Sequence, residues 1–182
     1  MKTTQASSYD RITIALHWLT AGIVLFQFLS AQIWDFFSRP THHLIIVSHT
    51  SLGIVLTAVL MARLFWRATS GRRLDHGSGL LDRAAQAGHH LLYGLLAAEV
   101  ALGFLFRWSG HSPLSFFGLI IASPFAPLSR SAHALIGQTH DLVAWIIIVI
   151  ALGHACAALF HHYVMRDGVL RRMLPGLSPH QD

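Results

Sequence analysis

Long apolar runs alternate with short polar stretches along the whole chain. Four runs provide about 20 or more mostly apolar residues each, the length that a helix needs to cross roughly 30 Å of hydrocarbon. They span approximately residues 12–34, 43–66, 86–108 and 131–163. Trp or Tyr lies at or near most of their ends, where an amphipathic ring suits the lipid headgroup region. The pattern predicts an all-α membrane protein, with residues 1–182 forming a single four-transmembrane-helix bundle.

The composition agrees with a membrane protein. Of the 182 residues, 53% are hydrophobic and only 12% are charged, whereas a soluble domain carries about 25% charged residues. The first run is longer than the apolar part of a secretory signal, which has about 7–15 residues. We therefore expect this run to be a retained transmembrane helix.

Positive charges predict the orientation of the bundle. Ten of the 13 Lys and Arg residues flank the N-terminus, the second connection or the C-terminus, and three belong to the first and third connections. The ten are Lys2, Arg11, Arg63, Arg67, Arg72, Arg73, Arg83, Arg166, Arg171 and Arg172, and the three are Arg39, Arg107 and Arg130. The positive-inside rule then places both termini in the cytoplasm. We interpret the net charge of +5 as a signal for topology and for contact with anionic lipid in the bacterial inner membrane, and not for nucleic acid.

The third and second connections between the apolar runs differ in composition. Residues 112–124 form an apolar patch between Pro113 and Pro124 that is too short to cross a membrane. We expect it at the outer interface, as a short re-entrant or surface segment. Residues 68–81 contain three glycines and are expected to form a flexible cytoplasmic loop.

Histidine is the unusual residue type of this chain. There are 14 histidines but a single cysteine, Cys156. One cysteine excludes an intramolecular disulfide, a cysteine-rich metal or iron–sulfur site and the C-x-x-C-H attachment of a covalent haem. Any haem must therefore be held through histidine.

Four histidines fall at two matched depths. His140 and His154 are 14 residues apart, so they share nearly one helix face and are separated by roughly 21 Å along the axis. On the predicted topology His17 lies at the cytoplasmic depth of His154, and His49 lies at the outer depth of His140. Neutral imidazoles at both axial positions suit a haem that only transfers electrons, and hydrocarbon favours the neutral form. The spacing therefore predicts two bis-histidine haems stacked across the bilayer, with these four residues as metal ligands.

The remaining histidines leave alternatives open. His89 shares the depth of His17 and His154, and spacing alone does not decide between an axial ligand and a partner of a haem carboxylate or a quinone. His133 is a possible substitute for the outer ligand, and His76 is given no role. The other histidines at interfaces or in loops are expected to contact solvated headgroups. They are His42, His43, His111, His161, His162 and His180.

Two acids and several small or basic residues add to the candidates. Glu99 lies inside the third run and is either a proton-relay or quinone-side residue or a protonated group facing a neighbouring helix. Asp141 is expected at the wet outer edge. Glycines near the ligands leave room for a macrocycle or allow close helix packing, and arginines at helix ends contact haem carboxylates or lipid phosphates. These residues are Gly22, Gly53, Gly137 and Gly153, and Arg11, Arg63, Arg67 and Arg107.

An ordered set of motifs resembles the prokaryotic cytochrome b561 family over nearly the whole chain. The motifs are Tyr9-Asp10-Arg11, Leu16-His17-Trp18-Leu19, His49-Thr50-Ser51-Leu52-Gly53, Gly88-His89 with Tyr93, Leu152-Gly153-His154 and His161-His162-Tyr163. The resemblance implies an inner-membrane bundle with two non-covalent haem b groups. It implies His17 with His154 as ligands on the cytoplasmic side and His49 with His140 on the periplasmic side, and it assigns His89 no axial role.

The expected function is electron transfer between the two sides of the membrane and a quinone pool, and no catalytic residue is assigned. The resemblance also suggests superoxide oxidation coupled to quinone reduction, which needs a positive outer funnel; His111, Arg107, Arg130 and His133 are candidates for it. A third possibility is a haem-bearing anchor subunit of a larger dehydrogenase or hydrogenase, with a protein electron donor. A different class, a histidine-rich metal transporter, is disfavoured because the histidines divide between two depths.

Overall fold

Four long helices make up most of the fold, a computed structural model that describes residues 8–71 and 79–174, apart from the side chains of residues 80–82. The helices are α1 (Arg11–Ile33), α2 (Arg39–Thr69), α3 (Leu80–Ser109) and α4 (Arg130–Phe160). Within the described residues, four helical segments are long and apolar enough to cross a membrane. The predicted four-helix membrane fold is therefore confirmed. Of the expected loop over residues 68–81, residues 72–78 lie outside the described residues, and residues 68–69 and 80–81 belong to α2 and α3. His76 and His180 also lie outside the described residues.

The short elements join and extend these helices. They are the 3-10 turns η1 (Trp34–Phe36) and η3 (Leu170–Met173), the π turn η2 (His161–Met165), and the strands β1 (Leu114–Phe116) and β2 (Leu119–Ile121). The helices α2 and α3 begin earlier than the apolar runs because a helix continues into the polar headgroup region. Pro40 stands in the first turn of α2, where its missing N–H costs nothing.

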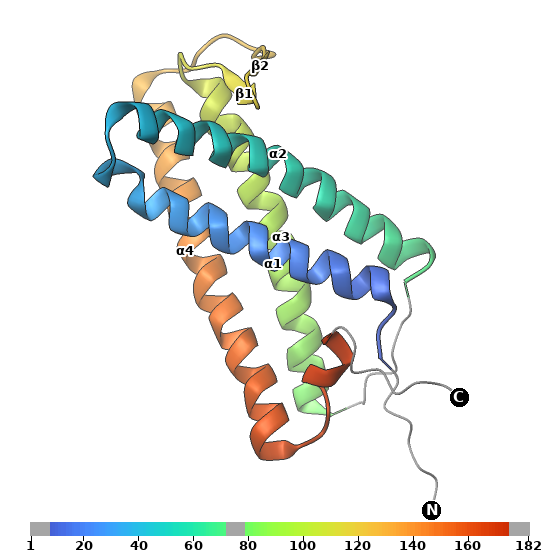
Figure 1. The fold of residues 1–182 in the computed structure, drawn as a ribbon. Helices are drawn as coiled ribbons and strands as arrows, with labels where there is room; N and C mark the ends of the chain where they lie inside the picture. Colours follow the sequence, from blue (N-terminus) through green and yellow to red (C-terminus); the bar gives the residue numbers. More distant parts are fainter. Residues whose placement is uncertain (1–7, 72–78, 175–182) are drawn as a thin grey trace, which may run out of the picture.

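The helices pack as two pairs that cross obliquely, α1 with α2 and α3 with α4 (Figure 1). We call the end that carries β1 and β2 the hairpin end. The opposite end, where the Tyr9 N–H donates to Arg172 O at 3.2 Å, we call the terminal end. There the Trp18 indole N–H also donates to Met173 O at 2.7 Å, so the C-terminal segment is fixed against α1.

Residues 112–124, expected as a re-entrant or surface segment, form a two-stranded antiparallel hairpin on the surface of the hairpin end. Its turn places Phe117 at φ 46° and Gly118 at φ 95°, the left-handed conformations that a two-residue hairpin turn requires. The hairpin is attached to α2, because Ser51 Oγ accepts from the Phe117 N–H at 2.8 Å. β2 is exposed along its whole length.

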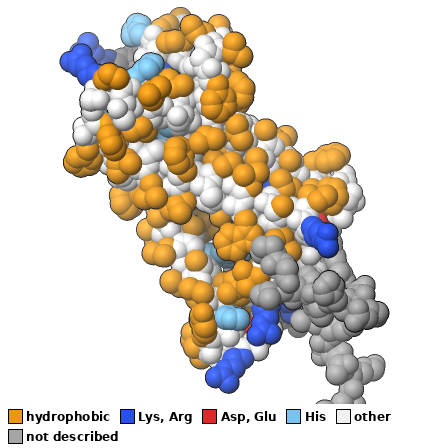
Figure 2. Space-filling view, viewed as in Figure 1, with side chains coloured by type: hydrophobic (Ala, Val, Ile, Leu, Met, Phe, Trp, Pro, Cys, Tyr) orange, Lys and Arg blue, Asp and Glu red, His pale blue; other side chains and the backbone are white. Residues whose placement is uncertain are grey.

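The buried core is small and lies at mid-height. It consists of Ile23, Leu56 and Val59 in one cluster and Leu60, Leu96 and Ile147 in another. Around it, large apolar side chains are exposed on all four helices. Figure 2 shows hydrophobic side chains over the middle of one face and Lys and Arg towards its ends. This distribution is the one expected of a protein surrounded by lipid.

Candidate functional site

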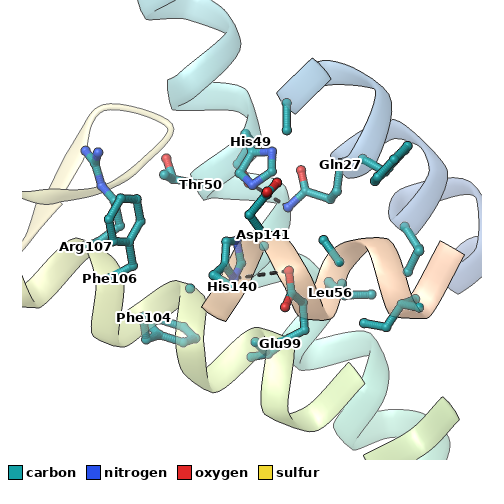
Figure 3. A pocket seen from close by; sticks show the side chains of 18 of the residues that line it. Gln27, His49, Thr50, Leu56, Glu99, Phe104, Phe106, Arg107, His140 and Asp141 are labelled. Carbon is teal, nitrogen blue, oxygen red and sulfur yellow. Dashed lines mark hydrogen bonds and ion pairs between the residues drawn. The ribbon is translucent and has the colours of Figure 1, made fainter. Parts of the chain in front are cut away.

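The hairpin end contains a cavity of about 340 Å³ that is lined by residues of all four helices. His49 of α2 and His140 of α4 both line it (Figure 3). Most of the other lining side chains are apolar, and Leu56 and Ile147 of the core close the cavity toward mid-height. The structure therefore brings together the two histidines that were predicted to share the outer depth.

His49 is held by the end of α1. Its Nδ1 lies 3.3 Å from the hydroxyl of Ser30, and its backbone carbonyl accepts from Gln27 Nε2 at 2.9 Å. The Trp34 ring stands edge-on to the imidazole at 5.4 Å between ring centres. The Ser30 hydroxyl and the Trp34 ring thus contact the imidazole, and Gln27 holds the backbone of the same residue. Its pairing with α1 was not apparent from the sequence.

His140 faces α3. Its Nδ1 lies 3.1 Å from Glu99 Oε1, the contact drawn in Figure 3. A Cβ atom added at Gly103 would lie 3.3 Å from His140 Cε1, so the imidazole lies close against the α3 backbone at a position without a side chain. The carboxyl group of Glu99 therefore faces the neighbouring helix α4 and contacts a histidine there, and a proton-relay or quinone-side role for Glu99 stays a prediction.

Several buried polar atoms around this cavity lack a hydrogen-bond partner. They are Gln27 Oε1, Glu99 Oε2, Arg107 Nε and His140 Nδ1, whose N–H is not aligned with Glu99 Oε1. Arg107 Nη2 donates to Pro113 O at 2.9 Å, which holds the guanidinium at the rim of the cavity. A half-buried guanidinium with a buried, unused N–H is suited to binding a carboxylate.

A second group of histidines lies at the terminal end. The ring centres of His17 and His154 are 6.3 Å apart, and those of His89 and His154 are 5.1 Å apart. Arg63 Nη2 lies 3.5 Å from His17 Nδ1. His89 is therefore a close neighbour of the pair, as its depth predicted.

The two histidines of α4 both face the interior of the bundle. His140 contacts Glu99 on α3, and His154 contacts His89 on α3 and His17 on α1. Neither is directed to the lipid. Ile147 of the buried core lies seven residues from each of them, so apolar packing separates the two groups. We refer to them as the hairpin-end tier (His49, His140) and the terminal-end tier (His17, His154, His89).

Other predicted residues have different positions. His133 stacks on Phe106 at 4.6 Å and lies 2.9 Å from Ser109 Oγ; it does not line the cavity. Arg63 and Arg107 lie beside the tiers, whereas Arg11 and Arg67 are exposed. The remaining described histidines at the helix ends either pair with an acid or an aromatic ring or are exposed. They are His42 beside Asp35, His161 beside Asp167, His162 beside Tyr163, and the exposed His43, His90 and His111.

The four glycines do not behave alike. Gly53 and Gly137 line the hairpin-end cavity, and a Cβ at Gly137 would lie 2.7 Å from Phe106 Cε2. A Cβ at Gly22 or at Gly153 would have no heavy atom within 4 Å. Close helix packing is therefore wrong as an explanation of Gly22 and Gly153, because no described residue of a neighbouring helix would contact a Cβ atom at either position.

Two residues that contact His49 in the structure were not identified from the sequence. Gln27 and Ser30 are polar residues within the first apolar run and are one helical turn apart. Polar side chains within a transmembrane helix almost always face the bundle interior. That rule would have directed attention to them, although it does not identify their partner.

Both tiers fit a haem. At the terminal end the imidazoles of His17 and His154 lie 6.3 Å apart between ring centres, next to the Arg63 guanidinium, a set of side chains that would suit a haem iron and its carboxylates. The hairpin-end cavity lies within the usual range of about 300–1,000 Å³ for cofactor pockets. It combines an apolar lining, two imidazoles and a guanidinium with an unused N–H.

A four-helix membrane bundle with half-buried histidines facing its interior in two tiers has the architecture of a membrane-embedded cytochrome of the b type. The chain belongs to the prokaryotic cytochrome b561 family, because the sequence model of that family matches residues 8–176. Cytochrome b561 homolog 2 of Escherichia coli (strain K12) is 32% identical over 172 residues, which are 91% of this chain and 90% of that protein. Cytochrome b561 homolog 1 of the same strain is 31% identical, covering 92% of this chain and 97% of that protein.

A further relative carries a more specific name. The probable superoxide oxidase CybB of Yersinia pestis is 28% identical over 173 residues, which are 92% of this chain and 96% of that protein. The resemblance seen in the sequence motifs is thus confirmed at the level of the family. The protein is a multi-pass membrane cytochrome of electron transport, and membership of this family implies binding of haem b.

Proposed function

We propose that the chain holds two haem b groups, one in each tier, and carries electrons between the outer side of the membrane and a quinone. His49 and His140 are the ligands at the hairpin end, and His17 and His154 are the ligands at the terminal end. The observation that carries the proposal is that α4 directs one imidazole into the bundle at each end, with the apolar core between them.

The side chains around each proposed haem favour transfer of electrons and disfavour binding of oxygen or water at the iron. Haem b supplies an iron that takes up or releases one electron at a time. Two imidazoles per iron leave no open coordination position, and the apolar lining of the cavity limits access of water. Arg107 at the hairpin end and Arg63 at the terminal end are placed to neutralise carboxylates of the bound group.

The hairpin end is assigned to the periplasmic side. Among the described residues, Arg11, Arg63, Arg67, Arg83, Arg166, Arg171 and Arg172 belong to the terminal end, and Arg39, Arg107 and Arg130 to the hairpin end. The positive-inside rule then supports cytoplasmic termini in the bacterial inner membrane. His89, next to His154 but outside the proposed ligand pair, remains a candidate to bind a quinone or a haem carboxylate.

Superoxide is a second candidate for the outer electron donor, because a 28% identical relative is named a probable superoxide oxidase. At the hairpin end Arg107 lies at the rim of the cavity, and Arg130 and His111 are exposed nearby on the same end of the bundle. Cationic side chains around a cleft attract an anion. Two superoxide anions would leave as two O₂ molecules, and one quinone would take the two electrons with two protons to form quinol.

Proteoliposomes that contain the purified protein and a ubiquinone test this function. Superoxide generated outside the vesicles should reduce the haems and then form quinol, and added quinol should reduce the haems if electrons flow in the other direction. Reduction by quinol without reduction by superoxide would leave electron transfer in place and remove the superoxide assignment. A colourless preparation that binds zinc would overturn the proposal in favour of a metal carrier. Co-purification with a soluble dehydrogenase would favour an anchor subunit.

A further inference from the structure

We propose that Ser30 and Glu99 are positioning residues of the hairpin-end tier, each accepting the Nδ1 proton of one histidine and so leaving its Nε2 lone pair for a metal. The inference rests on the proposed function, because it concerns histidines that are proposed to bind haem. It assigns roles to two residues of α1 and α3 that lie behind the ligands.

The hydrogen bonds of Ser30 favour one tautomer of His49. A serine hydroxyl carries a single hydrogen, and Ser30 Oγ donates it to Gln27 O at 3.0 Å. The His49 Nδ1 atom at 3.3 Å can then only donate to the hydroxyl oxygen. A neutral imidazole with its proton on Nδ1 has its lone pair on Nε2.

Glu99 has the equivalent position behind His140. Its Oε1 lies 3.1 Å from His140 Nδ1, a hydrogen-bonding separation in which the ring N–H is not yet aligned with the oxygen. The glutamate side chain is only 14% exposed. A carboxylate behind a metal-bound histidine fixes the ring orientation and makes the imidazole a stronger electron donor.

The two contacts involve different chemical groups, and this makes the two histidines of the tier unequal as metal ligands. His49 has a neutral hydroxyl behind it and His140 has a carboxyl group, so the carboxylate strengthens His140 as a ligand more than the hydroxyl strengthens His49. At the terminal end the described contact at His17 Nδ1 comes from Arg63, and a guanidinium only donates. His17 therefore differs from His49 and His140, whose Nδ1 atoms lie next to acceptor oxygens.

The glutamate predicts the redox behaviour of one haem. A carboxylate behind His140 stabilises the ferric state relative to the ferrous state, because the ferric state carries one more positive charge. In Glu99→Gln an amide oxygen can take the place of the carboxyl oxygen next to His140 Nδ1, but a glutamine side chain never carries a negative charge. We expect the hairpin-end haem to be retained while its ratio of reduced to oxidised form at a fixed potential rises, and we expect this rise to reach tenfold, about 59 mV for one electron, in titrations at alkaline pH.

Spectroelectrochemical titration of the full-length protein in detergent measures this shift, and the terminal-end haem in the same sample is the internal reference. The matched control is Asp35→Asn, which removes an exposed acid at the same end of the bundle that does not line the cavity. The control should change the ratio less than threefold. An equal shift in both variants, or no shift in Glu99→Gln, would overturn the role of Glu99.

Affinity for haem tests both residues. Loss of an outer partner of a metal ligand costs about 10–100-fold in affinity, and we expect this loss for the hairpin-end haem in Ser30→Ala and in Glu99→Ala. Thr20→Ala is the control for the serine, because Thr20 is also a buried hydroxyl of α1 but donates to Leu16 O at 2.7 Å. Equal haem loss in Ser30→Ala and Thr20→Ala, or full haem retention in Ser30→Ala, would overturn the role of Ser30.

Haem binding by the wild-type protein separates a failure of the proposed function from a failure of the roles given to Ser30 and Glu99. If it binds no haem at the hairpin end, the proposed function fails and the inference fails with it. If it binds both haems and the Glu99 and Ser30 variants behave like their controls, only the inference fails.

Discussion

Replacing His154 with alanine removes one proposed axial ligand from the terminal-end tier. His154 contacts His17 and His89, and none of the three lines the hairpin-end cavity. The variant should therefore lose one haem of two, and the haem held by His49 and His140 should keep its spectrum. His140→Ala is the matched variant and should lose the other haem.

Loss of the terminal-end haem should change the midpoint potential of the remaining haem only slightly, because the two haems are far apart. His140 and His154 are 14 residues apart on one helix, or roughly 21 Å along its axis. Two unit charges at that distance and an effective dielectric constant of about 20 interact by about 0.8 kcal/mol, which is about 35 mV for a one-electron couple. The midpoint potential of the remaining haem should therefore change by no more than about 35 mV.

Haem extraction with quantification per chain, followed by potentiometric titration, checks both expectations. Circular dichroism and gel filtration in detergent identify variants that fail to fold. A folded His154→Ala protein that lost both haems would refute the separation of the two tiers. So would a shift of the remaining potential far beyond the electrostatic limit.

Three further predictions concern individual contacts. Asp10 caps α1 through Thr13 N at 2.9 Å and accepts from Trp66 Nε1 at 2.9 Å, so Asp10→Ala should lower the free energy of unfolding by about 2–4 kcal/mol. Denaturation in detergent measures this loss, and Asp10→Asn should retain most of the stability. His89→Phe should still bind two haems per chain, and loss of one would make His89 a ligand. Burial alone would raise the pKa of Asp167, but hydrogen bonds from His161 and from the Val169 N–H lower it below its ordinary value. The stabilising effect of the carboxylate is therefore complete above that ordinary value and lost as the pH falls through the lowered one. Asp167→Asn should speed hydrogen exchange of the Val169 amide at pH 7 and have little effect near pH 3; equal effects at both pH values would contradict this assignment.

The periodicity of the sequence predicted the spans and the depth of the histidines because both depend on local properties. Apolar length determines which segments cross hydrocarbon, and 3.6 residues per turn determines that His140 and His154 share a face. The helix ends were less predictable, since α3 begins at Leu80, where the sequence is not continuously apolar. Helical hydrogen bonds continue into the headgroup region regardless of hydropathy.

The details of the hairpin-end tier could not be predicted from one sequence. The contact of Glu99 with His140 depends on how α3 is rotated against α4, and that of Ser30 with His49 depends on the pairing of α1 with α2. Rotation and pairing are properties of tertiary packing. The strands of the hairpin were also missed, because Phe117 in a left-handed conformation is unfavourable unless the pairing around it is formed.

The haem content and spin state of the purified full-length protein test the central claim most directly. Two haem b groups per chain, both low-spin in the ferric state as bis-histidine ligation requires, are the result that two tiers predict. One haem per chain, or a high-spin ferric signal from a folded protein with an open coordination position, would contradict it.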